Sequence, residues 1–178
     1  MLRIVPAGGR KFTPTVTWCQ NSAGERRWCI VPFARPTPFY RLELLAAHAG
    51  ATVLLVEGEK TADAGQRLFP VAVVTTWPGG SKAHPHVDFT PLRGRKVVCI
   101  PDADEPGRAA FLGRVDQRGK RIPGVLELLA GVGAETRIVE PEPWRAEGWD
   151  IADAEAEGWS PANAMAWLKD RLEVRDAA

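Results

Sequence analysis

The stretch TVLLVEGEKTADA, residues 52–64, contains the clearest structural pattern of the chain. It opens with the wholly apolar run Val53–Val56, which is typical of a strand buried on both faces of a parallel sheet. Glu57 and the turn glycine Gly58 follow, and a helical pattern begins at Glu59. Because ligands of open α/β sheets bind outside the carboxyl ends of the strands, Glu57 stands where chemistry is expected.

The composition is that of an ordinary globular protein. The chain has 178 residues, 45% hydrophobic and 25% charged, with a formal net charge of +1. This length suits one compact domain with a small appendage, and a net charge near zero means that a nucleic-acid partner requires a local basic patch. Apolar runs are too short to span a bilayer and the start lacks a signal-peptide pattern, so we expect a cytoplasmic protein without a membrane partner. Cys19, Cys29 and Cys99 show no C-x-x-C spacing, which favours reduced thiols over a zinc ribbon.

Strand and helix patterns alternate along most of the chain. A β-hairpin is expected within Thr13–Val31, followed by a proline-rich connector and a short helix over Tyr40–Ala49. The remaining patterns predict strands at 53–56, 71–75, 96–100 and 136–139, and helices at 59–68, 107–116, 125–130, 150–156 and 161–172. This alternation predicts a parallel sheet of about four strands, flanked by helices.

We therefore expect three segments. Residues 1–50 form the hairpin, the connector and the short helix, residues 51–160 form the α/β domain, and residues 161–178 form a C-terminal helix packed on it.

Three acids follow two of the predicted strands. Glu57 follows the first, and Asp102 and Asp104 follow the strand at 96–100, separated by one small residue. Carboxylates gathered in this way suit a hard divalent cation such as Mg²⁺, which would neutralise a phosphodiester and orient its oxygens. Each acid taken alone is better explained as a helix cap, but the set at neighbouring strand ends favours a functional site.

The combination of these motifs resembles the TOPRIM domain, which is shared by bacterial replicative primases, type IA and type II topoisomerases and several nucleases. The resemblance rests on VEGEK at 56–60 and PDADEPGR at 101–108, with the glycine loop Gly79-Gly80 between them. GWDIADA at 148–154 is similar to a later signature of phage- and plasmid-type primases and primase–helicases. The resemblance covers about residues 13–160, and it implies a TOPRIM-like Rossmannoid sheet preceded by a hairpin.

The resemblance also implies site residues. Glu57 matches the family glutamate that acts as a general acid or base and as a metal-site acid. Asp102 and Asp104 match the pair that coordinates Mg²⁺ or Mn²⁺. Glu59, Asp150 and Asp153 are further candidate ligands, and Asp150 is favoured as a helix N-cap. The replicative primases have an acid four residues after the glutamate, where this chain has Thr61.

Several glycines and basic residues complete the predicted site. The loop glycines are Gly58, Gly79, Gly80 and Gly107. The candidate phosphate or nucleic-acid ligands are Lys60, Lys82, Arg108, Arg118, Lys120 and Arg121. Arg108 suits bidentate phosphate binding, and the Arg114–Arg121 segment suits contacts along a nucleic-acid backbone. A solvated surface explains these basic residues equally well, and His84 and His86 are expected to be loop residues rather than metal ligands.

The resemblance implies a Mg²⁺- or Mn²⁺-dependent enzyme that performs nucleotidyl transfer in primer synthesis, with single-stranded DNA and nucleotides as substrates. A TOPRIM nuclease and a non-catalytic nucleic-acid or partner-binding module of a phage or plasmid replication assembly stay open as alternatives. A replicative helicase or another primase domain is a candidate partner. The single tyrosine, Tyr40, falls in a connector, so topoisomerase chemistry is not expected.

Overall fold

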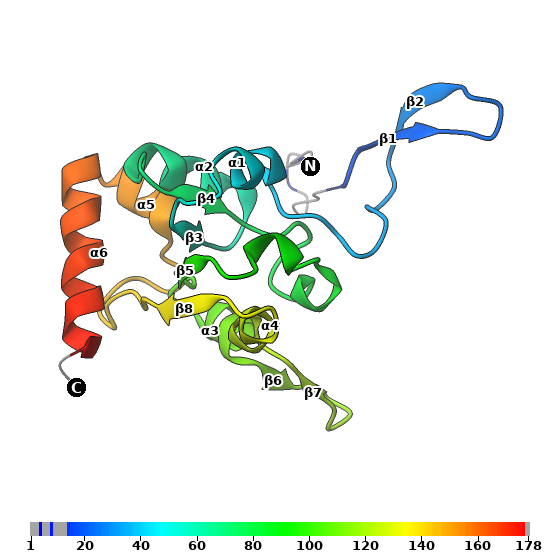
Figure 1. Ribbon diagram of the computed structural model, residues 1–178. Coiled ribbons are helices and arrows are strands. Elements are labelled where there is room, and N and C mark those ends of the chain that lie inside the picture. Colours follow the sequence, from blue (N-terminus) through cyan, green and yellow to red (C-terminus); the bar gives the residue numbers. More distant parts are fainter. Residues whose placement is uncertain (1–3, 5–7, 9–13, 177–178) are drawn as a thin grey trace. The chain divides into compact units, whose positions relative to one another are not determined.

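The central feature of the fold is a four-stranded parallel sheet (Figure 1). The computed structural model describes residues 4, 8 and 14–176. In spatial order the strands are β4 (Val73–Thr75), β3 (Val53–Leu55), β5 (Lys96–Cys99) and β8 (Glu135–Ile138). Val53 on the inner strand β3 lies opposite both Val73 and Val97, so the three strands share one register. The predicted parallel sheet and its approximate strand number are confirmed.

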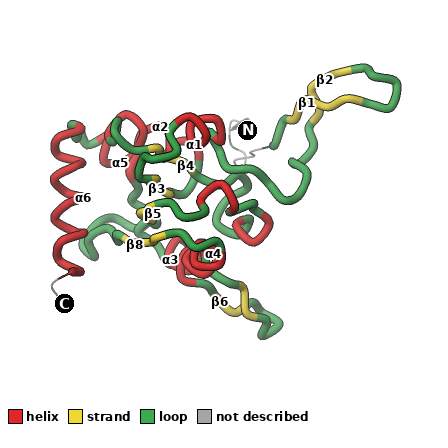
Figure 2. Tube along the Cα trace, in the orientation of Figure 1, coloured by secondary structure: helices red, strands yellow, loops and turns green. Residues whose placement is uncertain are grey.

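Helices cover both faces of this sheet (Figure 2). They are α1 (Leu42–Ala47), α2 (Glu59–Leu68), α3 (Glu105–Leu112), α4 (Val125–Gly131), α5 (Ile151–Ala156) and α6 (Pro161–Asp176). Two 3₁₀ turns, η1 (His84–His86) and η2 (Thr90–Leu92), join β4 to β5.

The strand residues alternate between two apolar layers because successive side chains point to opposite faces. Val53 and Leu55 belong to the layer that includes residues of α1, α3 and α4. Leu54 belongs to the opposite layer, with residues of α2, α5 and α6. All three side chains are at most 1% exposed, and full burial of each contributes about 1.5–3 kcal/mol. Burial on both faces explains why the strand has no polar alternation in its sequence.

The predicted C-terminal end of one helix is wrong. We expected a helix over 107–116, but α3 ends at Leu112, and an antiparallel ribbon of β6 (Arg114–Val115) and β7 (Arg121–Ile122) follows. Gly113 has a φ of 89°, and a side chain there would meet the Gly124 nitrogen at 2.9 Å. The Asp116 carboxylate accepts two backbone N–H groups of the next turn, which closes the ribbon instead of continuing the helix.

The chain divides into two compact units, Met1–Thr37 and Pro38–Ala178. The first contains the predicted hairpin, formed by β1 (Thr17–Gln20) and β2 (Arg26–Cys29). Its two cysteines are free thiols. The short helix α1 belongs to the second unit, where Leu45 is part of the core.

Among the described residues, no helix combines the length and the apolar character needed to cross a membrane.

Candidate cation site

Glu57 and Asp102 follow the carboxyl ends of two neighbouring strands. Their strands β3 and β5 are paired neighbours, and the pairing extends past the strand ends, because the Ile100 amide donates to the Leu55 carbonyl at 2.9 Å. Gly58 turns the chain with a φ of 76° and caps α2, so Glu57 occupies the turn between strand and helix. The two predicted acids therefore lie close together at the carboxyl ends of the strands.

The loop that carries Asp102 and Asp104 is tied to the GWDIADA segment. The Ala103 amide donates to the Trp149 carbonyl at 2.9 Å, and the Gly148 amide donates back to the Ala103 carbonyl at 3.1 Å. Segments 45 residues apart in sequence are thereby held as neighbours at the edge of the sheet.

The electrostatics reflect this crowding of acids. Burial raises the pKa of Glu57 to about 7; a backbone hydrogen bond from Asp102 opposes the rise and the charge of Asp104 adds to it. Burial also raises the pKa of Asp102 to about 8, with further contributions from the charges of Glu57, Asp150, Asp104 and Asp153. Without a cation, Glu57 and Asp102 are therefore partly protonated near neutral pH, and a bound cation would favour their ionised forms.

One carboxylate oxygen of this cluster is unsatisfied. Oε1 of Glu57 is buried and has no hydrogen-bond partner, although buried polar groups are almost always paired. Gly107 leaves room beside it, because a Cβ at that position would lie 2.8 Å from Glu57 Oε1 and 3.0 Å from Asp104 Oδ1. An orphaned oxygen, a neighbouring gap and carboxylate donors fit a hard cation such as Mg²⁺ or Mn²⁺.

Three of the candidate ligands are engaged in helix capping. Asp104 caps α3 by accepting the Gly107 amide at 2.6 Å, and Asp150 caps α5 by accepting the Ala152 amide at 2.6 Å. Asp153 accepts the Asp150 amide at 3.2 Å and completes a capping box. In the part of the chain that the structure describes, no three His, Cys, Asp or Glu side chains form a ready-made metal-binding group. A cation would therefore draw on carboxylates that now also serve the backbone.

A pocket of about 500 Å³ opens next to the Asp102–Asp104 loop. Six acidic and two basic residues belong to its lining, which includes Asp102, Asp104, Glu105, Arg108, Glu140, Glu142, Arg145 and Glu147. Arg108 pairs with Glu140 at 2.7 Å, and Arg145 pairs with Glu142 at 3.1 Å. Since both arginines already have acidic partners, the pocket is electronegative.

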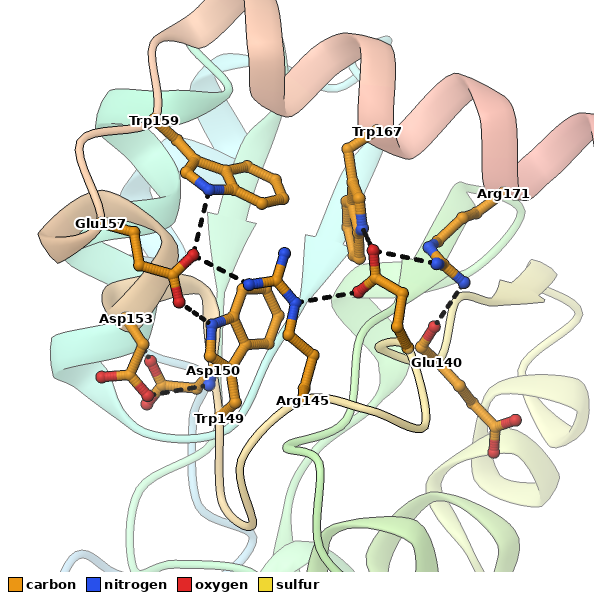
Figure 3. A network of polar contacts seen from close by, with 10 residues as sticks. Glu140, Arg145, Trp149, Asp150, Asp153, Glu157, Trp159, Trp167 and Arg171 are labelled. Atoms are coloured by element: carbon orange, nitrogen blue, oxygen red, sulfur yellow. Dashed lines mark hydrogen bonds and ion pairs between the residues drawn. The ribbon is translucent and has the colours of Figure 1, made fainter.

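The sequence reasoning missed the network that supports this pocket (Figure 3). The Arg145 side chain, 11% exposed, lies 4.3 Å from the Trp149 ring and pairs with Glu142 and Glu157. Glu157 also accepts the indole N–H groups of Trp149 and Trp159, at 2.7 and 3.2 Å. The available signal was the recurrence of tryptophan beside charged residues in WRAEGWD and EGWS, at 144–150 and 157–160.

Other predicted residues lie in different settings. Glu59 is in the first turn of α2, and Lys60 is exposed. Lys82 is exposed beyond Gly79 and Gly80, which turn the chain after β4 with φ values of 97° and 79°.

The basic cluster lies on the β6–β7 ribbon rather than at a helix end. Arg118 and Lys120 are exposed in its turn, and Arg121 pairs with Glu127 at 2.6 Å. No described contact joins these three residues to Glu57, Asp102 or Asp104.

His84 has a structural role. It is fully buried in η1, and its ring nitrogens lie 2.8 Å from the Ser81 carbonyl and 2.9 Å from the Pro123 carbonyl. With both nitrogens engaged, His84 has no position open for a metal.

Comparisons of the chain with protein-family models, curated proteins and solved structures found no match.

Proposed function

We propose that this protein is a Mg²⁺- or Mn²⁺-dependent enzyme of TOPRIM type that acts on nucleic-acid phosphodiesters, with nucleotidyl transfer in primer synthesis as its reaction. The observation that carries the proposal is the buried, unpaired Oε1 of Glu57 beside the Asp102–Asp104 loop. In the proposed site Glu57, Asp102 and Asp104 hold the cation. A divalent cation there supplies charge neutralisation and orientation of phosphate oxygens.

The electronegative pocket supports dependence on a cation. Its volume of about 500 Å³ falls within the range of small-ligand sites. A nucleotide or a nucleic-acid end is polyanionic, and the acidic lining would repel it unless positive charge were also present. Arg108 is half exposed, and we propose that it exchanges Glu140 for a phosphate oxygen when substrate enters.

Asp150 lies near Thr61, the position at which this chain lacks the acid of the replicative primases. The Thr61 hydroxyl donates to Asp150 Oδ2 at 2.9 Å, so a carboxylate from GWDIADA lies against the position where replicative primases have an acid. We propose that Asp150 supplies the negative charge that this helix position lacks.

Glu57 is also suited to proton transfer. With a pKa of about 7 in the cation-free protein, its carboxyl group exchanges a proton near neutral pH. The Glu57 carboxylate oxygen that does not hold the cation would accept the proton of an attacking hydroxyl, and the same group would return it to a leaving oxygen. A TOPRIM nuclease would use the same residues with water as the nucleophile.

A non-catalytic binding module is the second candidate. The observation that favours it is the absence, within the described residues, of a ready-made group of three metal-ligating side chains. If the capping roles of Asp104 and Asp150 are their only roles, the acids stabilise helices and the protein acts through binding, with a helicase or another primase domain as a candidate partner. Cation binding and activity therefore have to be measured separately.

The binding measurement compares two helical glycines. Gly107→Ala places a methyl group 2.8 Å from Glu57 Oε1, whereas Gly131→Ala meets no atom within 4 Å. We expect millimolar Mn²⁺ to raise the melting temperature of the unsubstituted protein and of Gly131→Ala, and to leave Gly107→Ala unchanged. An equal shift in all three proteins would place Mn²⁺ elsewhere and contradict the proposed site.

The activity measurement uses primer synthesis and cleavage on single-stranded DNA with Mg²⁺ or Mn²⁺. We expect the double variant Asp102→Asn/Asp104→Asn to lose at least a hundredfold in rate, and Glu135→Gln at the opposite end of the sheet to retain the rate. Activity that survives the double substitution would refute the metal mechanism, and Mn²⁺ binding without either activity would favour the binding module.

A further inference from the structure

The β1–β2 hairpin presents two exposed tryptophans side by side. Trp18 and Trp28 are cross-strand partners, and their ring centroids lie 5.1 Å apart. Their exposed fractions are 53% and 67%. Trp77 and Trp149 in the second unit are by contrast 2% and 4% exposed. The hairpin therefore offers two large aromatic faces to the solvent.

The same face of the hairpin carries polar and positive groups. Side chains alternate along a strand, so Gln20 and Arg26, a cross-strand pair two residues from the tryptophans, point to the same side as the rings. The Arg26 Nε donates to Gln20 Oε1 at 3.3 Å, which holds the guanidinium near the ring pair. Arg27 adds a second positive charge on the other face of the same strand.

Charge is unevenly divided between the two units. Residues 1–37 contain six basic residues and one acid, which gives +5, whereas residues 38–178 contain 17 basic and 21 acidic residues, which gives −4. The overall charge of +1 conceals this difference. A strongly basic segment with exposed aromatic rings complements a polyanion that has unpaired bases.

We propose that this face of the hairpin binds single-stranded nucleic acid. Bases stack on Trp18 and Trp28, Arg26 contacts a phosphate beside the rings, and Arg27 on the other face adds positive charge that attracts the polyanion. Stacking requires unpaired bases, so a duplex is excluded from the rings. The inference rests on the proposed function for its class of ligand, but it needs neither the cation nor the acidic site.

The first test measures the anisotropy of a labelled oligothymidylate about 15 nucleotides long, in EDTA, with the full chain. We expect Trp18→Ala/Trp28→Ala to weaken binding at least tenfold, which corresponds to about 1.4 kcal/mol. Trp144→Ala is the matched control, because Trp144 is 71% exposed but lies outside the hairpin, and it should bind within twofold of the unsubstituted protein. A duplex of the same length should bind more weakly than the single strand, and an oligouridylate shows whether RNA is accepted.

A second variant separates binding from folding of the hairpin, since a cross-strand aromatic pair also stabilises its own strands. Arg26→Gln/Arg27→Gln keeps both rings, so the exciton-coupled circular dichroism of the tryptophan pair should be retained. We expect this variant to bind more weakly and to show a shallower dependence of log Kd on log salt concentration.

The outcomes distinguish this inference from the proposed function. Asp102→Asn/Asp104→Asn should bind the oligothymidylate as the unsubstituted protein does, whatever its activity. Unchanged affinity of the tryptophan double variant would overturn the inference and leave the cation site untouched. Self-association in sedimentation that disappears with the tryptophans, without oligonucleotide binding, would also overturn it and identify the face as a protein contact.

Discussion

Glu57 illustrates how burial changes the behaviour of one side chain. The residue is 9% exposed, and burial raises the pKa of its carboxyl group to about 7. Burial also raises the pKa of the neighbouring Asp102 to about 8. An unfolded chain would ionise both groups near their ordinary pKa values of about 4. The folded state therefore holds these protons more tightly than the unfolded state does.

This difference predicts the pH dependence of stability without divalent cations. The contribution of the two acids is complete below about pH 4 and is lost as the pH rises through about 7 and 8. Urea unfolding in EDTA should show a free energy of unfolding on the order of 4 kcal/mol lower at about pH 9 than at about pH 6.

Glu57→Gln tests the cause of this loss. Glutamine has the same shape and no charge, so the variant should lose less stability over this range and should be the more stable protein at about pH 9. Glu135→Gln, an exposed acid at the other end of the sheet, should follow the unsubstituted protein. Parallel curves for all three proteins would show that Glu57 ionises normally.

At the scale of elements, the segment from Glu140 to Trp159 holds the acids at the carboxyl ends of β3 and β5 in position. Arg145 is the centre of this segment, because it contacts the rings of Trp144, Trp149 and Trp159 within 5.2 Å and pairs with two carboxylates. The backbone of Gly148 and Trp149 in turn holds the Asp102–Asp104 loop. Stability and the geometry of the acids are therefore coupled through one arginine.

Arg145→Met should lower the free energy of unfolding by about 3 kcal/mol, because it removes the ion pairs with Glu142 and Glu157 and the cation contacts with three tryptophan rings. Arg121→Met also removes an ion pair, but both partners are exposed, and the expected loss is below about 1 kcal/mol. Chemical denaturation of the two variants measures the difference. Equal losses would mean that Arg145 does not organise the segment.

At the scale of the whole molecule, the second unit has an apolar core of its own. Among the residues that the structure describes, the members of both apolar layers come from Phe39 onward. A chain that begins at Pro38 should therefore melt cooperatively within a few degrees of the full chain and keep its response to Mn²⁺. It should lose the affinity for oligothymidylate that we assign to the hairpin. Calorimetry and anisotropy on the same sample test both, and loss of the folded state on truncation would contradict the independence of the units.

Local sequence patterns were sufficient to predict most helices and strands of the fold. Val53–Val56 is apolar throughout, and only a strand covered on both faces suits such a run beside a helix with its own apolar stripe. The predicted bounds of α2 agree with the structure because Gly58 and Pro70 mark its ends. The prediction failed after α3, where Gly113 and the Asp116 turn outweighed a weak helical pattern.

Periodicity and short-range residue patterns are enough to predict the parallel sheet, the hairpin and the acids at the ends of β3 and β5. The unpaired Glu57 Oε1, the contact of Asp150 with Thr61 and the position of Arg145 among three tryptophans and two acids emerge only from the folded domain. Those contacts join segments up to 89 residues apart. Their partners are selected by packing of the whole domain, which no local pattern encodes.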